Sequence, residues 1–246
     1  MELNKIYNMD AFEGLRLIPD KSVDMVLTDP PYGTTRNKWD VAIDLELFWQ
    51  EIKRITKRGA PILMFSQMPF AAKAVVSNLQ MFRYEWIAEK ARATGFLNAR
   101  RMPMKAHENV LVFYDSLPVY NPQKTKGKAY KRSGSIQSDN YGYFKPIKKR
   151  DYPAERFPRD VLRDLWKHPQ GRIFHPTQKP ILLCEYFIKT YSNEGAIVLD
   201  PFMGSGTTAL AAINTNREFI GFEKEKEYFD IAQKRINQAM PLSPSE

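Results

Sequence analysis

Apolar residues along this 246-residue chain recur with two spacings, one typical of buried strands and one typical of helices. Short apolar runs bounded by turn residues predict strands at 4–8, 23–29, 59–66, 195–201 and 218–223. Apolar residues every three or four positions predict helices at 11–18, 45–57, 70–80, 179–192, 207–216 and 224–240. Because helices separate the strands, the pattern predicts crossover connections and a mostly parallel sheet in an α/β fold.

Two further strands, 83–90 and 107–115, follow each other without a helix and predict an antiparallel hairpin around a long basic loop, 91–105. No clear period exists between 117 and 174. A structureless segment of that length inside a compact domain is expected only where it is functional. We therefore expect a catalytic half at 1–116, an inserted recognition region at 117–174, a cofactor-binding half at 175–240 and a tail at 241–246.

Charge is distributed very unevenly along the chain. The whole chain has 37 Lys and Arg against 28 Asp and Glu, a net charge of +9. The window 117–174 alone has 14 basic and 5 acidic residues, so it carries the entire excess, together with nine aromatic residues. Interleaved basic and aromatic residues suit a phosphate backbone and its bases. A solvated basic surface is the other interpretation, and the segregation into one window favours binding to a polyanion.

The composition argues against several other classes of protein. One cysteine, Cys184, and three histidines predict neither a disulfide framework nor a metal centre. No apolar run has the length of a membrane helix, and the first residues lack the apolar core of a secretory signal. We therefore expect a cytoplasmic protein with no membrane contact.

A glycine motif lies between the predicted strand 195–201 and the helix that follows it. Gly204, Gly206 and Ala209 fit the pattern G-x-G-x-x-G/A, in which the first glycine permits a tight turn and the second permits close approach of a ligand. The next strand ends at Glu223, where an acid can bind ribose hydroxyls. A dinucleotide would need a pyrophosphate site, whereas Asp200 before the glycines better suits the cationic methionine part of S-adenosylmethionine.

A second motif, Asp29-Pro30-Pro31-Tyr32, ends the predicted strand 23–29. By itself it could be an ordinary turn. Ligands of parallel sheets bind beyond the carboxyl ends of the strands, however, so this turn and the glycine motif are expected to share one cleft. There Asp29 and the Pro30 carbonyl could accept hydrogen bonds from a planar amine, while Tyr32 could stack on its ring. The two prolines stiffen the turn.

Taken together, these residues resemble the amino-methylating DNA methyltransferases, most closely the β group. The resemblance covers nearly the whole chain. It rests on DPPYG (29–33), HPTQKP (175–180), DPFMGSGTT (200–208) and FIGFE (219–223), with the basic window where that family has its target-recognition region. It implies a Rossmann-like, circularly permuted fold that uses S-adenosylmethionine and flips its target base out of the DNA.

The resemblance also implies roles for individual residues. Asp29, Pro30, Pro31 and Tyr32 would form the catalytic turn, in which Asp29 orients the amine and methyl transfer is direct. The cofactor would be bound by Asp10, Ala11, Asp29, Thr177, Lys179, Asp200, Phe202, Gly204, Ser205, Gly206, Thr207 and Glu223. Within that set, Thr177 and Lys179 are expected near the methionine carboxylate and Asp10 near the adenine. Permutation further predicts that the C-terminal helix ends near the N-terminus.

Basic residues around the predicted cleft are expected to contact double-stranded DNA. They are Arg36, Lys38, Trp39, Arg92, Arg100, Arg101, Lys124, Lys126, Lys128, Lys131, Arg132, Lys148, Lys149 and Arg150. Within the family, an Asp at the first position of the catalytic turn is typical of adenine-N6 enzymes, so Asp29 favours adenine over cytosine-N4. A protein or RNA methyltransferase, an idle DNA-binding protein and a nicotinamide-dependent oxidoreductase are the other interpretations. The sequence leaves open a homodimer and a separate restriction endonuclease.

Overall fold

The computed structural model describes residues 1–33, 41–134, 147–152, 154–166 and 178–239. The chain divides into a main unit, Met1–Asn121 with Asp160–Glu246, and an inserted unit, Pro122–Arg159. Among the described residues, no helix is both long and apolar enough to cross a membrane.

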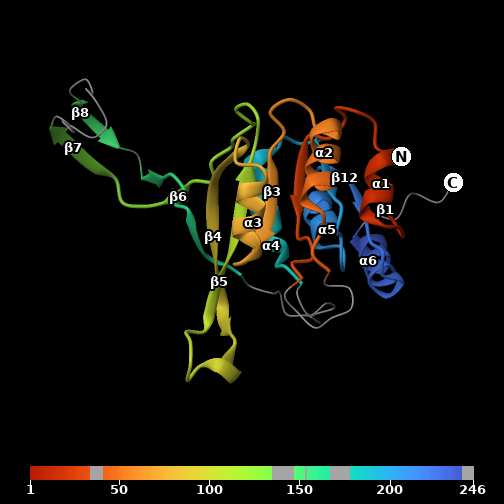
Figure 1. The fold of residues 1–246 in the computed structure, drawn as a ribbon. Coiled ribbons are helices and arrows are strands. Elements are labelled where there is room, and N and C mark those ends of the chain that lie inside the picture. Colours follow the sequence, from red (N-terminus) through yellow and green to blue (C-terminus); the bar gives the residue numbers. More distant parts are fainter. Residues whose placement is uncertain (34–40, 135–146, 153, 167–177, 240–246) are drawn as a thin grey trace. The chain divides into compact units, whose positions relative to one another are not determined.

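The main unit is built on an eight-stranded sheet with the strand order β1-β12-β11-β2-β3-β5-β4-β10 (Figure 1). Its strands are β1 (Lys5–Tyr7), β2 (Met25–Thr28), β3 (Ile62–Ser66), β4 (Phe82–Thr94), β5 (Lys105–Phe113), β10 (Val161–Trp166), β11 (Ile197–Asp200) and β12 (Glu218–Phe222). Neighbouring strands are parallel except that β5 runs antiparallel to both β3 and β4. The predicted mostly parallel sheet with an antiparallel hairpin is confirmed.

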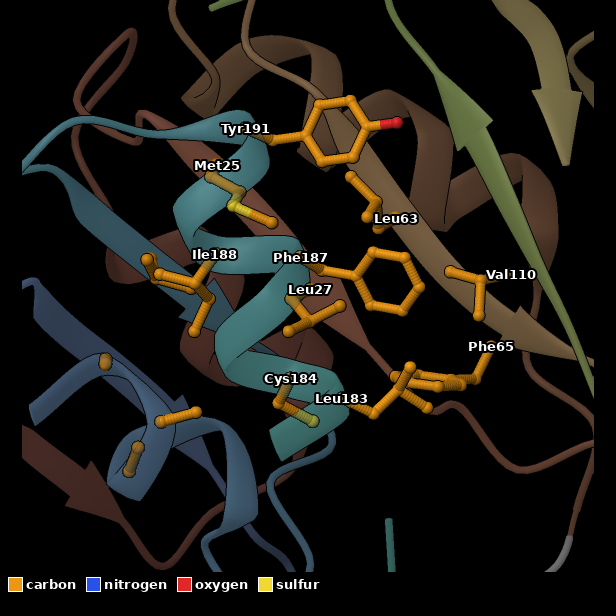
Figure 2. Close-up of a cluster of buried hydrophobic side chains, with 14 of the residues drawn as sticks. Met25, Leu27, Leu63, Phe65, Val110, Leu183, Cys184, Phe187, Ile188 and Tyr191 are labelled. Carbon is orange, nitrogen blue, oxygen red and sulfur yellow. The ribbon is translucent and has the colours of Figure 1, made fainter. Parts of the chain in front are cut away.

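Helices cover both faces of this sheet. They are α1 (Ala11–Leu17), α2 (Leu45–Ile55), α3 (Phe70–Ser77), α4 (Ile181–Tyr191), α5 (Thr207–Asn214) and α6 (Lys226–Ala239). Residues of α1 to α3 belong to one hydrophobic core and residues of α4 to α6 to the other. In β2, Val26 belongs to the first core while Met25 and Leu27 belong to the second, which explains why this strand is apolar throughout. Figure 2 shows the second core, where Phe187 of α4 lies over Leu27 and Leu63.

The first strand of the chain completes the last part of the sheet. β1 pairs in parallel with β12, so that Lys5 lies opposite Ile220, and α6 packs against β1. The C-terminal helix therefore lies beside the N-terminal strand, as the permuted order predicts. The central pair, β2 and β11, is also parallel, with Leu199 opposite Val26. The strands that carry the two motifs are therefore neighbours.

The structure differs from the sequence prediction around the basic segments. β4 continues to Thr94 and pairs there with Lys105, so Arg92 lies on a strand and only 95–104 form the connection. Part of the window 117–174 also belongs to the main sheet, where β10 pairs with β4. The inserted unit has two antiparallel pairs, β6 (Thr125–Lys126) with β9 (Glu155–Arg156) and β7 (Tyr130–Gly134) with β8 (Ile147–Tyr152). β10 joins the edge of the sheet by pairing with β4, a strand distant in the sequence, and the local spacing of apolar residues does not reveal that pairing.

Candidate active site at the carboxyl ends of β2 and β11

The glycine turn connects β11 to α5 with two residues in the left-handed region, Gly204 at φ 55° and Gly206 at φ 85°. A Cβ atom on Gly206 would lie 3.0 Å from the Cβ of Ala232 in α6, whereas one on Gly204 would have no atom within 4 Å. Gly206 therefore allows close packing of α6, and Gly204 leaves space for a ligand. The space beside Gly206, where the sequence predicts close approach of a ligand, is occupied by Ala232 of α6, whereas the space beside Gly204 is open.

Acidic side chains surround this turn. Asp200 is buried, and it accepts hydrogen bonds from the Thr208 hydroxyl (2.7 Å) and the Phe202 amide (3.1 Å). Burial raises the pKa of Asp200 to about 7. Glu223 accepts from the Gly204 amide (2.8 Å) with one oxygen and from the Glu225 amide (2.8 Å) with the other. Burial likewise raises the pKa of Glu223. These acids favour a cationic ligand over a pyrophosphate.

The glycine turn and the catalytic turn open into one cavity of about 700 Å³, within the range of small-molecule sites. Its lining includes the predicted residues Asp10, Ala11, Asp29, Pro30, Pro31, Tyr32, Lys179, Asp200, Phe202, Gly204, Ser205, Thr207 and Glu223. Asp10 caps α1 by accepting a hydrogen bond from the Phe12 amide (3.0 Å). The expected shared cleft is therefore present at the carboxyl ends of β2 and β11.

The catalytic turn is held by contacts on both sides of Tyr32. The Tyr32 hydroxyl donates to Asp29 Oδ1 (2.6 Å). The Tyr32 ring stacks on Phe70 at the start of α3, with 5.0 Å between the ring centroids and 26° between the planes. One face of the tyrosine ring is thus supported by an aromatic residue far away in the sequence. The orientation of the Tyr32 ring is therefore set by contacts within the protein.

A buried cluster of two ammonium and two carboxylate groups lies behind the catalytic turn. Lys179 forms ion pairs with Asp29 and, at 3.3 Å, with Glu108 of β5. Lys90 of β4 pairs with the other oxygen of Glu108 at 2.7 Å. Both Lys179 and Glu108 are 7% exposed. Because the charges balance, the cluster can remain ionised although it is largely shielded from water.

These groups shift one another's pKa values. Burial raises the pKa of Asp29, and the Lys179 ammonium offsets only part of this increase. For Lys179, burial lowers the pKa, but the carboxylates of Asp29 and Glu108 outweigh it and leave the pKa above its ordinary value. Burial raises the pKa of Glu108, but Lys179 and Lys90 outweigh it and lower the net value. Sequence reasoning missed Glu108 and Lys90, because only the β4–β5 hairpin brings them to the site.

The predicted DNA-contacting residues fall into several places. Arg92 lines the cavity, and the exposed Arg100 and Arg101 lie in the connection between β4 and β5. Lys124, Lys126 and Lys128 are exposed in the inserted unit, and Lys131, Arg132, Lys148, Lys149 and Arg150 belong to β7 and β8. Arg36, Lys38, Trp39, Thr177 and the tail 241–246 lie outside the described residues.

Comparison with known proteins agrees with this geometry. The family model described as DNA methylase matches residues 23–234. The chain is 32% identical to the type II methyltransferase M.BglII of Bacillus subtilis, covering 96% of this chain and 69% of the relative. It is 31% identical to the DNA adenine methyltransferase YhdJ of Escherichia coli (strain K12), covering 100% of this chain and 86% of the relative. The complex of M1.HpyAVI with SAM (S-adenosylmethionine) has a TM-score of 0.63 at 27% identity, covering 94% of this chain and 98% of that one.

The fold and the cavity are those of a methyltransferase that uses S-adenosylmethionine. The chain belongs to the N6/N4 DNA methylase family, whose members methylate exocyclic amines of DNA bases. The expected cofactor and the recognised family are confirmed. The residues present fit that cofactor, because Gly204 leaves open space beside the buried Asp200 and the partly buried Glu223, whose carboxylates suit its cationic groups. Among the described residues, no group of three or more His, Cys, Asp or Glu could hold a metal ion.

Proposed function

We propose that this protein methylates the N6 amine of adenine in double-stranded DNA. The observation that carries the proposal is the position of Asp29, a partly buried carboxylate that directly follows β2, in the same cavity as the glycine turn. An ionised carboxylate accepts hydrogen bonds and donates none, so Asp29 suits a hydrogen of an exocyclic amine. The adenine specificity carried in the name of YhdJ, a relative covered along 100% of this chain, supports the choice of base.

In this proposal Asp29 and the Pro30 carbonyl accept hydrogen bonds from the amine and orient its lone pair toward the methyl group. S-adenosylmethionine, when bound, supplies an electrophilic methyl group on a sulfonium. Direct transfer then needs no covalent enzyme intermediate. Holding two reacting groups in line can supply several kcal/mol, up to ~7–11 kcal/mol for ideal alignment. Tyr32, already supported by Phe70, provides the stacking surface for the flipped base.

Asp29 keeps acceptor capacity beside its present partners, because each carboxylate oxygen has two lone pairs. One oxygen accepts from the Tyr32 hydroxyl and the other pairs with Lys179. We infer that the amine binds the oxygen that now accepts from Tyr32, because disturbing the ion pair with Lys179 would leave a charge without compensation. Lys179 then keeps Asp29 ionised and oriented, and Glu108 with Lys90 holds Lys179. This positioning role replaces the methionine-carboxylate role that the sequence suggested for Lys179.

The cofactor residues are assigned as follows. Asp200 faces the cationic methionine part, Glu223 binds the ribose hydroxyls, and Asp10 and Ala11 lie beside the adenine. Gly204 permits close approach of the ligand, with Phe202, Ser205 and Thr207 around it. Ser205 is held in place because its hydroxyl accepts a hydrogen bond from the Arg235 guanidinium (3.0 Å). The support for this assignment is that all these residues line one cavity.

The inserted unit and the β4–β5 connection would supply the DNA surface. Both carry exposed basic side chains, and phosphate contacts make DNA affinity fall with salt. Log K is expected to fall by about 0.9 for each phosphate neutralised. The measurement is binding to a fixed duplex over a range of salt concentrations. A flat response would remove these segments from the DNA surface.

Cytosine-N4 methylation is the second candidate, because the family includes both amines. A catalytically idle DNA-binding protein is the candidate from another class. The cavity argues against idleness, since both motifs are intact and lie in one cleft.

Transfer of labelled methyl groups from S-adenosylmethionine to unmethylated genomic DNA tests the proposal, followed by nucleoside digestion and mass spectrometry. We expect N6-methyladenine with the wild-type chain and none with Asp29→Ala. N4-methylcytosine would keep the mechanism and overturn the base assignment. No labelled base from a chain that still binds the cofactor would point to RNA or protein substrates.

A further inference from the structure

The connection between β4 and β5, residues 95–104, projects away from the rest of the main sheet (Figure 1). Residues of both strands line the cavity. We call residues 95–104 the hairpin tip. Lys90, Arg92 and Thr94 of β4 line the cavity, and the tip begins at the next residue after Thr94. At a rise of ~3.3 Å per residue, the tip lies on the order of 10–15 Å beyond Arg92. Anything bound in the cavity as part of a long polymer therefore passes near the tip.

The tip is folded by its own backbone hydrogen bonds. A 3₁₀ helix, Phe96–Asn98, follows Gly95, whose φ of 90° makes the turn. The carbonyl of Asn98 accepts from the amides of Arg101 (2.8 Å) and Met102 (3.0 Å). These bonds present the side chains of the helix in a fixed arrangement, so the tip has a defined surface.

That surface is apolar and almost fully exposed. Leu97 is 98% exposed and Phe96 77%, and Met102 is 55% exposed. Burying a leucine or phenylalanine side chain against a partner is favourable, because it removes a large apolar area from water. Neither residue contributes to either core of the main unit. Together with Met102, Phe96 and Leu97 therefore form an exposed apolar group that a partner outside the main unit could cover.

The charge of the same hairpin indicates what that partner is. Residues 91–105 contain four basic residues and no acidic residue. The partner must combine a dense anionic surface with an apolar slot, and a DNA duplex combines phosphates with stacked bases in this way. Continuity with the cavity favours DNA over a protein or a membrane, because the root of the hairpin already lines the site where the target base is methylated.

We propose that Phe96 and Leu97 insert into the DNA base stack beside the target, filling space that the base leaves when it rotates into the cavity. The inference rests on the proposed function and adds a base-opening role to it. Flipping a base costs a few kcal/mol of unpairing and unstacking. Apolar side chains wedged between base steps are a known way of stabilising distorted DNA. Arg100 and Arg101 would then contact the phosphates that flank the opened step.

The test compares wild type with the double variant Phe96→Ala and Leu97→Ala on two duplexes. Both contain the target sequence, which is first mapped by sequencing intact genomic DNA that the wild type has methylated; one duplex is fully paired and one has a mismatch opposite the target base. On the paired duplex we expect kcat/KM to fall at least about tenfold, because opening loses its wedge. On the mismatched duplex, where opening costs less, the loss should shrink to within about threefold. Fluorescence of 2-aminopurine at the target position, which rises when the base leaves the stack, should rise less with the double variant than with wild type on the paired duplex.

Leu79→Ala is the matched control, because Leu79 is 66% exposed and precedes β4 at the opposite end from the tip. It should leave both duplexes unaffected. Leu97→Ser repeats the test with a single change should the double variant fold poorly. An equal loss on both duplexes, or no loss on either, would overturn the wedge. The wedge would also be overturned if the double variant methylated both duplexes normally and differed from wild type only in its sedimentation coefficient. That result would assign the tip to contact between copies of this chain. Failure of the wild type to methylate DNA would instead overturn the proposed function.

Discussion

The two walls of the cavity are held in place in different ways. The cofactor wall is a local structure, in which one turn between β11 and α5 is fixed by its glycines and by the Glu223 carboxylate on the Gly204 amide. The catalytic wall depends on distant segments. Asp29 follows β2, and it is held by Lys179 before α4 and by Glu108 of β5. Substitutions in the first wall should therefore change the fit of a ligand, and substitutions in the second should change a charge state.

The largest effect is expected at Asp29 of the catalytic wall. Asp29→Ala removes the hydrogen-bond acceptor that orients the amine, so kcat should fall by at least ~1,000-fold. Binding of S-adenosylmethionine, measured by calorimetry, should change by only a few fold, because Asp200 and Glu223 remain. Near-normal methylation by this variant would remove Asp29 from its catalytic role.

The charge cluster predicts the next largest effect. Lys179→Met leaves two carboxylates beside one ammonium, which raises the pKa of Asp29 further. Activity requires ionised Asp29, so the acidic limb of the pH–rate profile should move to higher pH, and kcat at neutral pH should fall ~100-fold. Lys90→Met, one charge further from Asp29, is the matched control and should move the limb less. A lower kcat with an unshifted limb would show that Lys179 does not control the ionisation of Asp29.

A pH dependence of cofactor binding is expected from Asp200. Its pKa of about 7, against an ordinary value of 3.8, leaves it protonated below neutrality and ionised above. Affinity for S-adenosylmethionine should therefore rise about tenfold from pH 6 to pH 8, as for one titrating group. Between the ordinary pKa of 3.8 and the folded-state pKa of about 7, Asp200 binds a proton in the folded state but not in the unfolded chain. Without cofactor, the free energy of unfolding should therefore fall as the pH rises from about 4 to about 7.

Asp200→Asn is the test of that assignment. It should remove the rise in cofactor affinity with pH in calorimetry and flatten the pH dependence of thermal stability. A variant that keeps the wild-type pH profile would show that another acid, with Glu223 the nearest candidate, carries the titration.

The smallest effects distinguish the two glycines of the turn. Gly206→Ala places a Cβ atom 3.0 Å from Ala232 at a left-handed φ, so it should destabilise the fold by about 1–3 kcal/mol. Gly204→Ala meets no atom within 4 Å and should cost only about 1 kcal/mol of stability, for its backbone conformation. It should instead weaken cofactor binding about fivefold. Thermal unfolding measures the loss of stability of each variant, and calorimetry measures its affinity for the cofactor. Equal effects of the two substitutions on both quantities would contradict the different roles given to Gly204 and Gly206.

Much of the fold was predictable from periodicity. Strands buried on both faces, such as Met25–Thr28, are continuous apolar runs, and helices such as Leu45–Ile55 have their apolar residues on one face. The carboxyl ends of neighbouring parallel strands lie together, so the sequence could also predict that the catalytic turn shares a cleft with the glycine turn. Both inferences depend on local spacing and on general topology, and neither needs the register of particular strands.

The sequence by itself determined the two motifs, the permuted order and the segregation of basic charge. Only the tertiary structure decided which lysine meets Asp29, that Glu108 and Lys90 complete its charge balance, and that Phe70 supports Tyr32. It also decided that α6 fills the space beside Gly206 and that β10 joins the main sheet. The physical reason is the same in each case. These contacts join residues distant along the chain, and hydrophobic periodicity predicts which residues are buried without specifying their partners.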